Sequence, residues 1–520
     1  MASFYDSASI ITIPSGYKAG TLYSAKPTDG TGDMDFTRTG DTATRVNSSG
    51  IIERCITNLL LNSATLSTQS VTLIAQPYTL SIFGTGSVVI TGTGSGTLTG
   101  TGASNRVSLT FTPTAGVVIF TVTGSVTTAQ LQTGDIATNY IATAGTAVTQ
   151  GPVTNLPRLD YFGSTCPQLL MEPTRTNLET YSEIFNNSSW VKTTTSVSAN
   201  VAVSPDGYQN ADALIEDTNS GIHSIAKALS FVSGTTYTIS CFVKQGSGTR
   251  RFAIVTDGVA FGGTYICNFN LQTGVVVNSG AQIVGKIENY GNGWFRCSAV
   301  ATATATATRS ITFCLRNNDV TGISSYTGDG TSSLFIWGAQ VEAGTHITSY
   351  IPTVAATVTR NQELATKGSI SSLIGQVEGT AFIDFDYIRP TSDGNGRLLI
   401  LRDSSENTNA INSMIFPSNQ FQLTVSSGGT GTNVIPASSS TLIPFGRNKI
   451  AIAYNDGSYV VYRNGSLFAS ATSVKPLGTL TNIDLGNSAI NTRNLANPIN
   501  QSLVFKTRLT NAELATLTTL

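Results

Sequence analysis

Hydrophobic and polar residues alternate along most of this chain, and that alternation predicts β-strands. Residues 107–112 (Val-Ser-Leu-Thr-Phe-Thr) and 309–315 (Arg-Ser-Ile-Thr-Phe-Cys-Leu) show the period of two expected of strands that bury one face. Turn dipeptides interrupt such runs, and those at Asp456-Gly457 and Asn464-Gly465 predict two consecutive hairpins. Short strands joined by frequent tight turns are typical of β-sandwiches and barrels.

A helical pattern is clearest near the C-terminus, in residues 510–517. Thr510 stands in the N-cap position, and Glu513 follows three residues later, where a capping box places its acid. We therefore expect an all-β fold of tandem antiparallel β-sandwiches, of jelly-roll type, with a short C-terminal helix.

Two internal repeats divide the chain into modules. Residues 129–150 and 339–360 are identical at nine of 22 positions, beginning with Ala-Gln in both copies. Upstream, residues 53–63 and 172–182 share a Glu, the triplet Thr-Asn-Leu and a Ser. Each module thus opens on Thr-Asn-Leu and closes on Ala-Gln, which favours a sandwich whose first and last strands pair.

These repeats set the domain boundaries that we expect. Residues 51–150 form a small β-sandwich, residues 151–360 a larger jelly roll, and residues 361–520 a third sandwich that ends in the short helix. Residues 1–50 show no self-contained core, so we expect an N-terminal arm that packs on a partner or on the next module.

Composition and charge exclude several functions. Charged residues make up 11 % of the chain, against about 25 % in ordinary soluble proteins. The net charge is −1 and no Lys/Arg patch appears, so nucleic acid is not an expected partner. The 22 Phe and 17 Tyr argue against disorder.

Segments that would direct the chain to a membrane are also not expected. No run of about 18 apolar residues suggests membrane insertion, and the first residues do not resemble a signal peptide. The six Cys show no Cys-x-x-Cys spacing, and the two histidines, His223 and His346, give little material for a metal site or a Ser-His-Asp triad. We therefore expect a product assembled in a cytoplasm, with no cofactor and no metal.

Several motifs resemble segments of structural proteins from tailed bacteriophages, in particular tail fibres and head fibres. The first is residues 35–53 (Asp-Phe-Thr-Arg-Thr-Gly-Asp-Thr-Ala-Thr-Arg-Val-Asn-Ser-Ser-Gly-Ile-Ile-Glu), followed by Thr57-Asn-Leu59. Further motifs of this kind are Ser-Pro-Asp-Gly at 204–207, Asn-Gly-Trp-Phe-Arg-Cys at 292–297, Phe-Ile-Trp-Gly-Ala-Gln-Val-Glu at 335–342 and Ser-Tyr-Ile-Pro at 349–352.

The resemblance implies jelly rolls similar to carbohydrate-binding modules. The last domain is similar to concanavalin A-like, or laminin-G-like, sandwiches through Gly-Thr-Ala-Phe-Ile at 379–383, the two hairpins and residues 508–514. Such jelly rolls often hold a structural calcium near their first and last strands. Glu179 or Glu183, with Glu342, could occupy those positions, and the spacing leaves this open.

Catalytic residues are not expected. A glycosidase needs two carboxylates that flank the scissile bond. Asp384 and Asp386 lie on one side of a predicted strand, but the Glu-x-Asp-x-x-Glu string of concanavalin-like hydrolases does not occur. The chain also lacks the β-helix repeats typical of phage depolymerases. We expect a binding protein and no enzyme.

Exposed aromatic rings and planar polar groups are what sugar binding requires, since rings stack on C–H faces while hydroxyl groups take hydrogen bonds. Three aromatic residues in loop-like stretches, and four polar residues that border a predicted strand of the last domain, are the candidates for a glycan site: Trp190, Tyr208, Tyr326, Asn395, Arg397, Arg402 and Asp403.

The function that follows is a non-enzymatic virion component, a tail or head fibre or spike. Residues 1–50 would dock it to other virion proteins, and the sandwiches would contact host-surface glycans as a homotrimer. The alternative is a purely structural capsid decoration or tail component without glycan binding. The choice between head and tail stays open.

Overall fold

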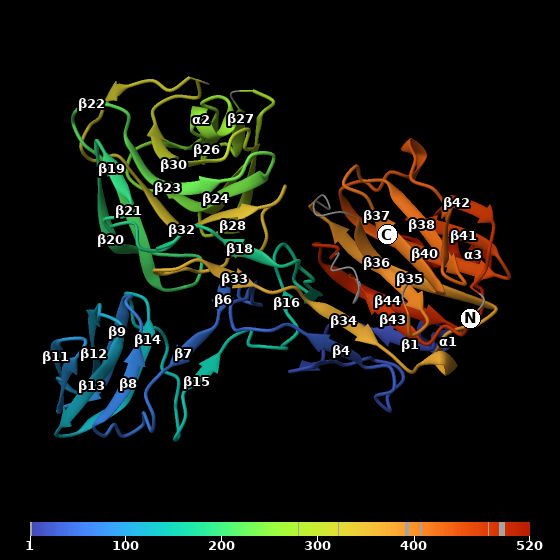
Figure 1. The fold of residues 1–520 in the computed structure, drawn as a ribbon, viewed down its shortest axis with the longest axis horizontal. Coiled ribbons are helices and arrows are strands. Elements are labelled where there is room, and N and C mark those ends of the chain that lie inside the picture. Colours follow the sequence, from blue (N-terminus) through green and yellow to red (C-terminus); the bar gives the residue numbers. More distant parts are fainter. Residues whose placement is uncertain are drawn as a thin grey trace.

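The computed structural model describes residues 3–520 apart from 279, 321, 390–394, 406–407, 477 and 488–493. It contains three β-sandwiches that lie side by side (Figure 1). The all-β expectation is confirmed, including the short C-terminal helix α3 (Asn511–Thr518), where Thr510 and Glu513 form the capping box. No helix within the described ranges is long and apolar enough to cross a membrane.

Two large sheets form the C-terminal sandwich, and a continuous apolar core that includes Phe36, Phe385 and Leu401 lies between them. One sheet comprises β1 (Ile10–Thr12), β16 (Leu159–Asp160), β17 (Gln168–Leu169), β35 (Glu378–Tyr387), β40 (Gly446–Asn455), β41 (Ser458–Arg463), β42 (Ser466–Thr472) and β44 (Ile499–Phe505). The other comprises β2 (Tyr17–Lys18), β3 (Thr21–Leu22), β4 (Met34–Thr37), β34 (Leu364–Lys367), β36 (Gly396–Arg402), β37 (Ala410–Ile415), β38 (Phe421–Ser427), β39 (Thr430–Ile435) and β43 (Asn482–Leu485).

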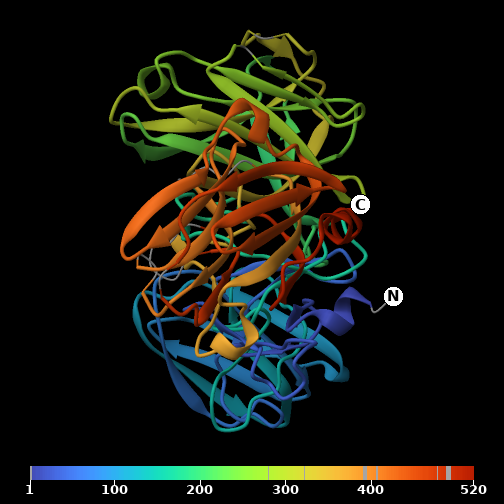
Figure 2. The same ribbon diagram turned by 90° about the vertical axis from the view of Figure 1, so that its right-hand side faces the viewer.

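Residues 1–50, expected to be an arm that packs on a partner or on the next module, instead contribute strands to this C-terminal sandwich. β1 pairs with β44, placing Ile10 opposite Val504, and β4 pairs with β34, placing Phe36 opposite Ala365. Met34 and Phe36 are fully buried in its core. Figure 2 shows the N-terminal segment beside the C-terminal domain. The other two sandwiches are therefore inserted into a domain that the two ends of the chain build together.

The second sandwich packs two six-stranded sheets around an aromatic core. One sheet comprises β19 (Val191–Thr193), β23 (Ser224–Phe231), β25 (Arg251–Val255), β26 (Ile266–Asn270), β27 (Val275–Asn278) and β30 (Ala307–Arg316). The other comprises β20 (Thr195–Val203), β21 (Gln209–Glu216), β24 (Thr236–Gln245), β28 (Ile283–Gly291), β29 (Trp294–Thr302) and β32 (Ser333–Ala343). A one-turn helix, α2 (Gly258–Phe261), and the pair β22 (Ser220–Gly221) and β31 (Tyr326–Thr327) complete it.

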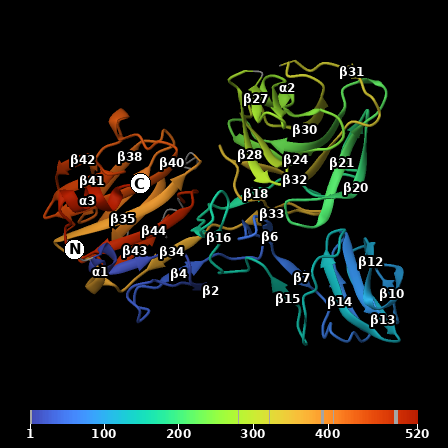
Figure 3. The same cartoon turned by 180° about the vertical axis from the view of Figure 1, so that it is seen from behind.

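The first sandwich is smaller and lies at one corner of the molecule (Figure 3). Its four-stranded sheet contains β8 (Gln69–Leu73), β10 (Ser87–Gly92), β11 (Gly96–Thr99) and β13 (Gly116–Thr123). Its three-stranded sheet contains β9 (Tyr78–Gly84), β12 (Gly102–Phe111) and β14 (Val126–Thr133). A hairpin of β5 (Thr44–Val46) and β6 (Ile52–Arg54) leads into it.

The paired opening and closing strands expected from the repeats are confirmed in both modules. β7 (Ile56–Asn58) pairs with β15 (Val148–Gln150), and β18 (Arg175–Asn177) pairs with β33 (Val358–Arg360). Asn58, from the first Thr-Asn-Leu triplet, donates to the Ala129 and Ile141 carbonyls and accepts from the Leu60 and Leu131 amides.

Asn177 makes the matching set of four bonds, to Ala339, Ile351, Glu179 and Val341. One buried amide side chain thus ties the start of each sandwich to its end. Since both its donors and its acceptor are buried and satisfied, each Asn is costly to replace.

The two copies differ where the second one meets its neighbours. Gln150 in the first copy is exposed, whereas the corresponding Arg360 is fully buried and forms an ion pair with Glu172 (3.0 Å).

That junction is a cluster of buried charges at the points where the chain passes between modules. Glu363 contacts Arg38 (3.0 Å) and Arg158, and all three side chains have no exposed surface. Glu172 contacts Arg158 (2.8 Å), Arg360 (3.0 Å) and Arg389 (3.2 Å). Arg38 also donates to the Pro152 and Val153 carbonyls of the linker that follows the first sandwich.

Burial alone would raise the pKa of Glu172, but Arg360, Arg158 and Arg389 outweigh it and hold that pKa well below the usual range. The pKa of Glu363 is lowered as well, because Arg158 and Arg38 outweigh its burial. A carboxylate with a depressed pKa in the folded state stabilises the fold above its unfolded pKa of about 4.3, and this contribution is lost as the pH falls below that value. The junction is therefore fully charged at neutral pH.

Replacing Glu363 by Gln should lower the free energy of unfolding by about 3–5 kcal/mol, because Arg38 would stay buried without its counter-charge and Arg158 would keep only Glu172. Denaturant unfolding followed by the fluorescence of the three Trp, all in the second sandwich, measures this change. The control is Asp456→Asn, which removes the exposed ion pair with Lys475 and should change nothing measurable. Equal stability of the two variants would contradict the role given to the cluster.

Asn58→Ala and Asn177→Ala should each weaken only the sandwich that contains the residue. Each substitution leaves two buried carbonyls and two buried amides without partners, for a loss of a few kcal/mol. Hydrogen exchange read by mass spectrometry should show faster exchange in β7 and β15 for the first variant, and in β18 and β33 for the second. Protection lost across all three sandwiches in either variant would contradict a local tie.

Candidate functional site

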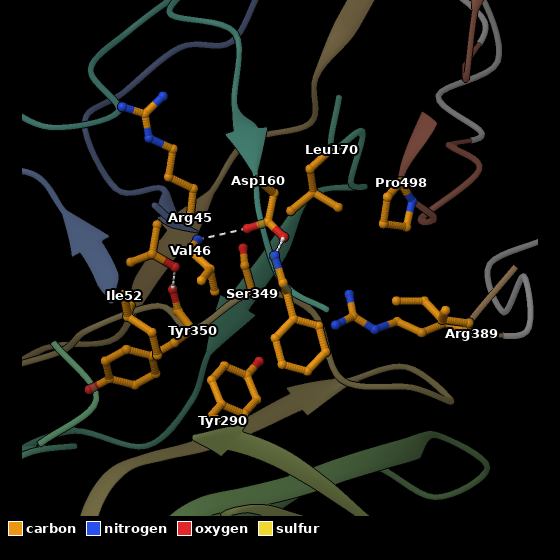
Figure 4. A pocket seen from close by; sticks show the side chains of 13 residues that line it. Arg45, Val46, Ile52, Asp160, Leu170, Tyr290, Ser349, Tyr350, Arg389 and Pro498 are labelled. Carbon is orange, nitrogen blue, oxygen red and sulfur yellow. Dashed lines mark hydrogen bonds between the residues drawn. The ribbon is translucent and has the colours of Figure 1, made fainter. Parts of the chain in front are cut away.

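One cavity at the junction is too small for a ligand. It lies between the β5–β6 hairpin, the linker around Asp160, and residues of the second and third sandwiches, as Figure 4 shows. Its volume is about 20 Å³, which is room for about one water molecule. Asp160 does not point into an open site, since its carboxylate accepts from the Val46 amide (2.7 Å) and the Phe162 amide (3.0 Å).

A more open pocket of about 320 Å³ lies at one end of the C-terminal sandwich. Its wall comes from the hairpin between β37 and β38, the segment before β40, and the end of β41. The residues that line it are Asn419, Leu442, Ile443, Pro444, Phe445 and Arg463. Its size falls in the range of small-molecule sites, of about 300–1,000 Å³.

An exposed aromatic ring dominates this pocket. Phe445 is 59 % exposed although it is one of the bulkiest apolar side chains of the domain. Pro444 and Gly446 flank it, so it stands just before β40 begins. The ring of the buried Tyr387 stacks on it, with centroids 5.1 Å apart and planes inclined by 9°. Tyr387 thus fixes the orientation of Phe445, and the exposed part of that ring faces solvent.

Planar polar groups surround the ring. The Tyr387 hydroxyl donates to Asn419 Oδ1 (2.6 Å), which fixes the amide, and no described residue accepts from Asn419 Nδ2. The Arg463 guanidinium lies over the Phe468 ring (4.8 Å) and donates to the Leu442 carbonyl (2.7 Å). Partial burial lowers the pKa of Arg463, but an arginine stays charged at neutral pH. An apolar face beside fixed amide and guanidinium donors can hold a sugar ring by stacking and by hydrogen bonds.

Two of the predicted residues, Asn395 and Arg397, lie at this same end of the nine-stranded sheet. Gly396 pairs with Ile415, Ile415 pairs with Phe421, and Gln420 forms a bridge with Leu442 of the pocket. Asn395 is half-buried and Arg397 is buried, and both side chains contact the Met414 sulfur, at 3.4 and 3.6 Å.

Arg402 and Asp403 lie at the opposite end of β36, so the sheet does not bring the four polar candidates together. Arg402 is buried in a two-bond ion pair with Asp484, at 2.8 and 3.0 Å. Asp403 accepts from the Ser405 amide and from Asn409, which shapes its own turn. The contacts of both side chains stabilise the folded domain.

Trp190 does not offer a sugar platform, contrary to the expectation. Its side chain is 1 % exposed and packs against Phe185, with centroids 4.9 Å apart, in the core of the second sandwich. Its Nε1 donates to the Tyr181 carbonyl (3.1 Å). The polar Asn-Asn-Ser-Ser stretch before it is a surface turn, but the ring that follows turns inward.

Tyr326 and Tyr208 lie in two other places. Tyr326 is half-buried, donates to Glu216 (2.7 Å), and has the Arg250 guanidinium over its ring (5.2 Å), so it takes part in an internal network. Tyr208 lines a cleft of about 470 Å³ between the first and second sandwiches, and its hydroxyl accepts from the Asn139 amide (3.3 Å). The predicted aromatic candidates therefore do not form one site.

The acidic candidates are all engaged with partners. Asp384 forms a two-bond ion pair with Arg447, at 3.0 and 2.8 Å, which leaves no open pair with Asp386. Glu179 contacts Lys227 (3.2 Å), Glu183 contacts Arg54 (2.7 Å), and Glu342 accepts from Thr348. Across the described part of the chain, no three metal-ligating side chains gather closely enough to hold an ion.

Sequence reasoning missed Phe445, Asn419 and Arg463, because the pocket joins segments that are far apart in the chain. The one local signal is Pro444-Phe445-Gly446, an aromatic residue between two residues that break regular strands. Only the folded sandwich places Asn419 and Arg463 beside it.

Comparison with known proteins assigns the fold of the domain that holds this pocket. Residues 387–515 match the family model of the concanavalin A-like lectin/glucanases superfamily. The match contains every residue that lines the pocket and confirms the expected concanavalin A-like fold of the last domain. No curated protein matches the chain.

Solved structures give weak matches to parts of the chain. The CBM40 domain of the Ruminococcus gnavus IT-sialidase shares 15 % identity at a TM-score of 0.25, over 29 % of this chain and 91 % of that one. The NanB sialidase from Streptococcus pneumoniae shares 12 % identity at 0.23, over 29 % and 26 %. The SAP-like pentraxin from Limulus polyphemus shares 13 % identity at 0.22, over 28 % and 70 %.

Proposed function

We propose that this protein is a non-enzymatic glycan-binding appendage of a tailed-bacteriophage virion. The glycan-binding part of this proposal is supported by the exposed Phe445 ring in a concanavalin A-like domain. This ring is stacked on Tyr387 and flanked by Asn419 and Arg463. Such a shallow site binds a glycan weakly on its own, and several copies in a homo-oligomer, such as a trimer, raise the avidity.

The assignment to a virion rests on the resemblance of residues 35–53 and the later motifs to tail-fibre and head-fibre proteins. Several of these motifs build the contacts that hold the modules together. Arg38, from the first motif, lies in the charge cluster, and the Pro205 carbonyl, from Ser-Pro-Asp-Gly, accepts from the Ile52 amide of the hairpin (2.9 Å). The proposed location is the virion, after assembly in the host cytoplasm.

Docking through residues 1–50 is not tested by deleting them, because the deletion would remove four strands from the C-terminal sandwich. Loss of incorporation after such a truncation would report a folding defect. The competing function is a purely structural decoration or tail component, which needs no glycan site.

Phe445→Ala should weaken glycan binding at least tenfold. Covering a Phe ring is worth about 1.5–3 kcal/mol, and 1.4 kcal/mol is a factor of ten in affinity. The measurement is a glycan array probed with the full chain displayed on multivalent beads, followed by titration of the best glycan. Leu467→Ala, at a residue 57 % exposed on β42 of the same sandwich, is the matched control and should bind like the wild type.

Equal binding by the two variants would contradict the assignment to this pocket. Absence of any binding by the wild-type chain at high valency would favour the structural alternative.

The virion assignment predicts that purified particles contain this chain in several copies. Quantitative mass spectrometry of gradient-purified particles gives the copy number, and antibody labelling in the electron microscope distinguishes head from tail. Absence of the chain from particles that are otherwise complete would overturn the assignment while leaving the glycan site untouched.

A further inference from the structure

Charged side chains are almost missing from the first sandwich. The chain has 29 basic and 30 acidic residues, but residues 55–157 contain only Arg106 and Asp135. Both are used internally: Arg106 donates to the Thr138 carbonyl and to Ser81 (2.7 Å), and Asp135 accepts from Asn200 of the second sandwich (3.1 Å). Free surfaces of soluble domains carry about 25–35 % charged residues. The surface of this module has the composition of an interface core, from which charge is depleted.

The outer face of its four-stranded sheet carries three exposed apolar side chains. Val89, Val117 and Ile119 are 37 %, 49 % and 40 % exposed. Their partners across the strands all carry hydroxyl groups: Thr97 and Thr121 oppose Val89, Thr91 and Ser70 oppose Ile119, and Thr72 opposes Val117. We call these eight residues the threonine face.

We propose that the threonine face is where copies of this chain contact one another. This inference rests on the proposed homo-oligomeric function and names the surface responsible. A hydroxyl group both donates and accepts hydrogen bonds. The hydroxyl groups of one threonine face can therefore form hydrogen bonds with those of the same face on a second copy. With no charge on either side, two copies do not repel each other. A charged partner would lose solvation there without gaining an ion pair.

The position of the module allows this contact. The first sandwich lies at the corner of the molecule away from the C-terminal sandwich, and the chain enters and leaves it through β7 and β15 alone (Figures 1 and 3). The sheet face therefore remains free of the other two modules, as the exposure of Val117 and Ile119 also shows.

The size of the face predicts a weak contact. Four strands about 4.8 Å apart, each presenting about 20 Å of length, give roughly 400 Å² per copy. A pair would bury about 800 Å², which is below the roughly 1,000 Å² of a stable interface. Association through this face alone should therefore need micromolar concentrations, and additional contacts in a closed ring would strengthen it.

The test is sedimentation velocity of the full chain across micromolar concentrations. The wild type should associate reversibly. The double variant Val117→Lys with Ile119→Lys should lower the association constant at least tenfold, because it places buried positive charges opposite each other. The control is Val191→Lys with Val275→Lys, at residues 61 % and 53 % exposed on the second sandwich, and it should associate like the wild type.

A third variant, Val117→Thr with Ile119→Thr, keeps β-branched side chains in the strands and separates a folding defect from a lost contact. It should associate only slightly less than the wild type. A monomeric wild type, unchanged association of the lysine double variant, or equal loss in the control would overturn the proposal. Glycan binding by the lysine double variant, measured on beads, should be intact, so failure here is distinguishable from failure of the glycan site.

Discussion

The constraint on which the rest of the structure depends is the buried charge cluster at the junction. The chain begins in the C-terminal sandwich, leaves it twice to build the other two, and returns each time, and the crossing points are held by Glu172 and Glu363. Both carboxylates contact arginines from different segments, so the cluster connects the N-terminal strands, both linkers and the last domain. Desolvating these ions is expensive, and only their mutual pairing with correct geometry offsets it. Such a cluster is therefore compatible with few arrangements of the modules other than the observed one.

In both inserted sandwiches a buried Asn connects the first and last strands, but the two modules differ in how they contact the junction. Asn58 and Asn177 hold the ends of their modules together through the same four hydrogen bonds. The second copy adds Arg360, which enters the charge cluster, while the first copy has Gln150 in solvent. The second sandwich is therefore fixed to the C-terminal one, and the first is attached mainly through the chain segments that enter and leave it at β7 and β15. This arrangement leaves the end of the C-terminal sandwich and the outer face of the first sandwich open to other molecules.

Local patterns in the sequence were enough for the fold class, the paired strands of the repeats and the C-terminal helix, because period-two alternation and capping depend on neighbouring residues. They were not enough for the N-terminal segment. The pairing of Ile10 with Val504 joins the two ends of the chain, and no local sequence pattern near Ile10 predicts it. Trp190 follows a polar stretch that is typical of a loop, yet its ring fills the core. The residues that line the Phe445 pocket come from three separate segments, and the Tyr387 ring that stacks on Phe445 comes from a fourth. The sequence alone does not show that these segments lie close together.

Differential scanning calorimetry of the intact chain tests most directly whether the junction unites the modules. The account predicts that the second and C-terminal sandwiches unfold in one cooperative transition at neutral pH, because they share Glu172, Arg360 and Glu363, with the first sandwich as a separate transition. Three independent transitions, one for each sandwich, would contradict it.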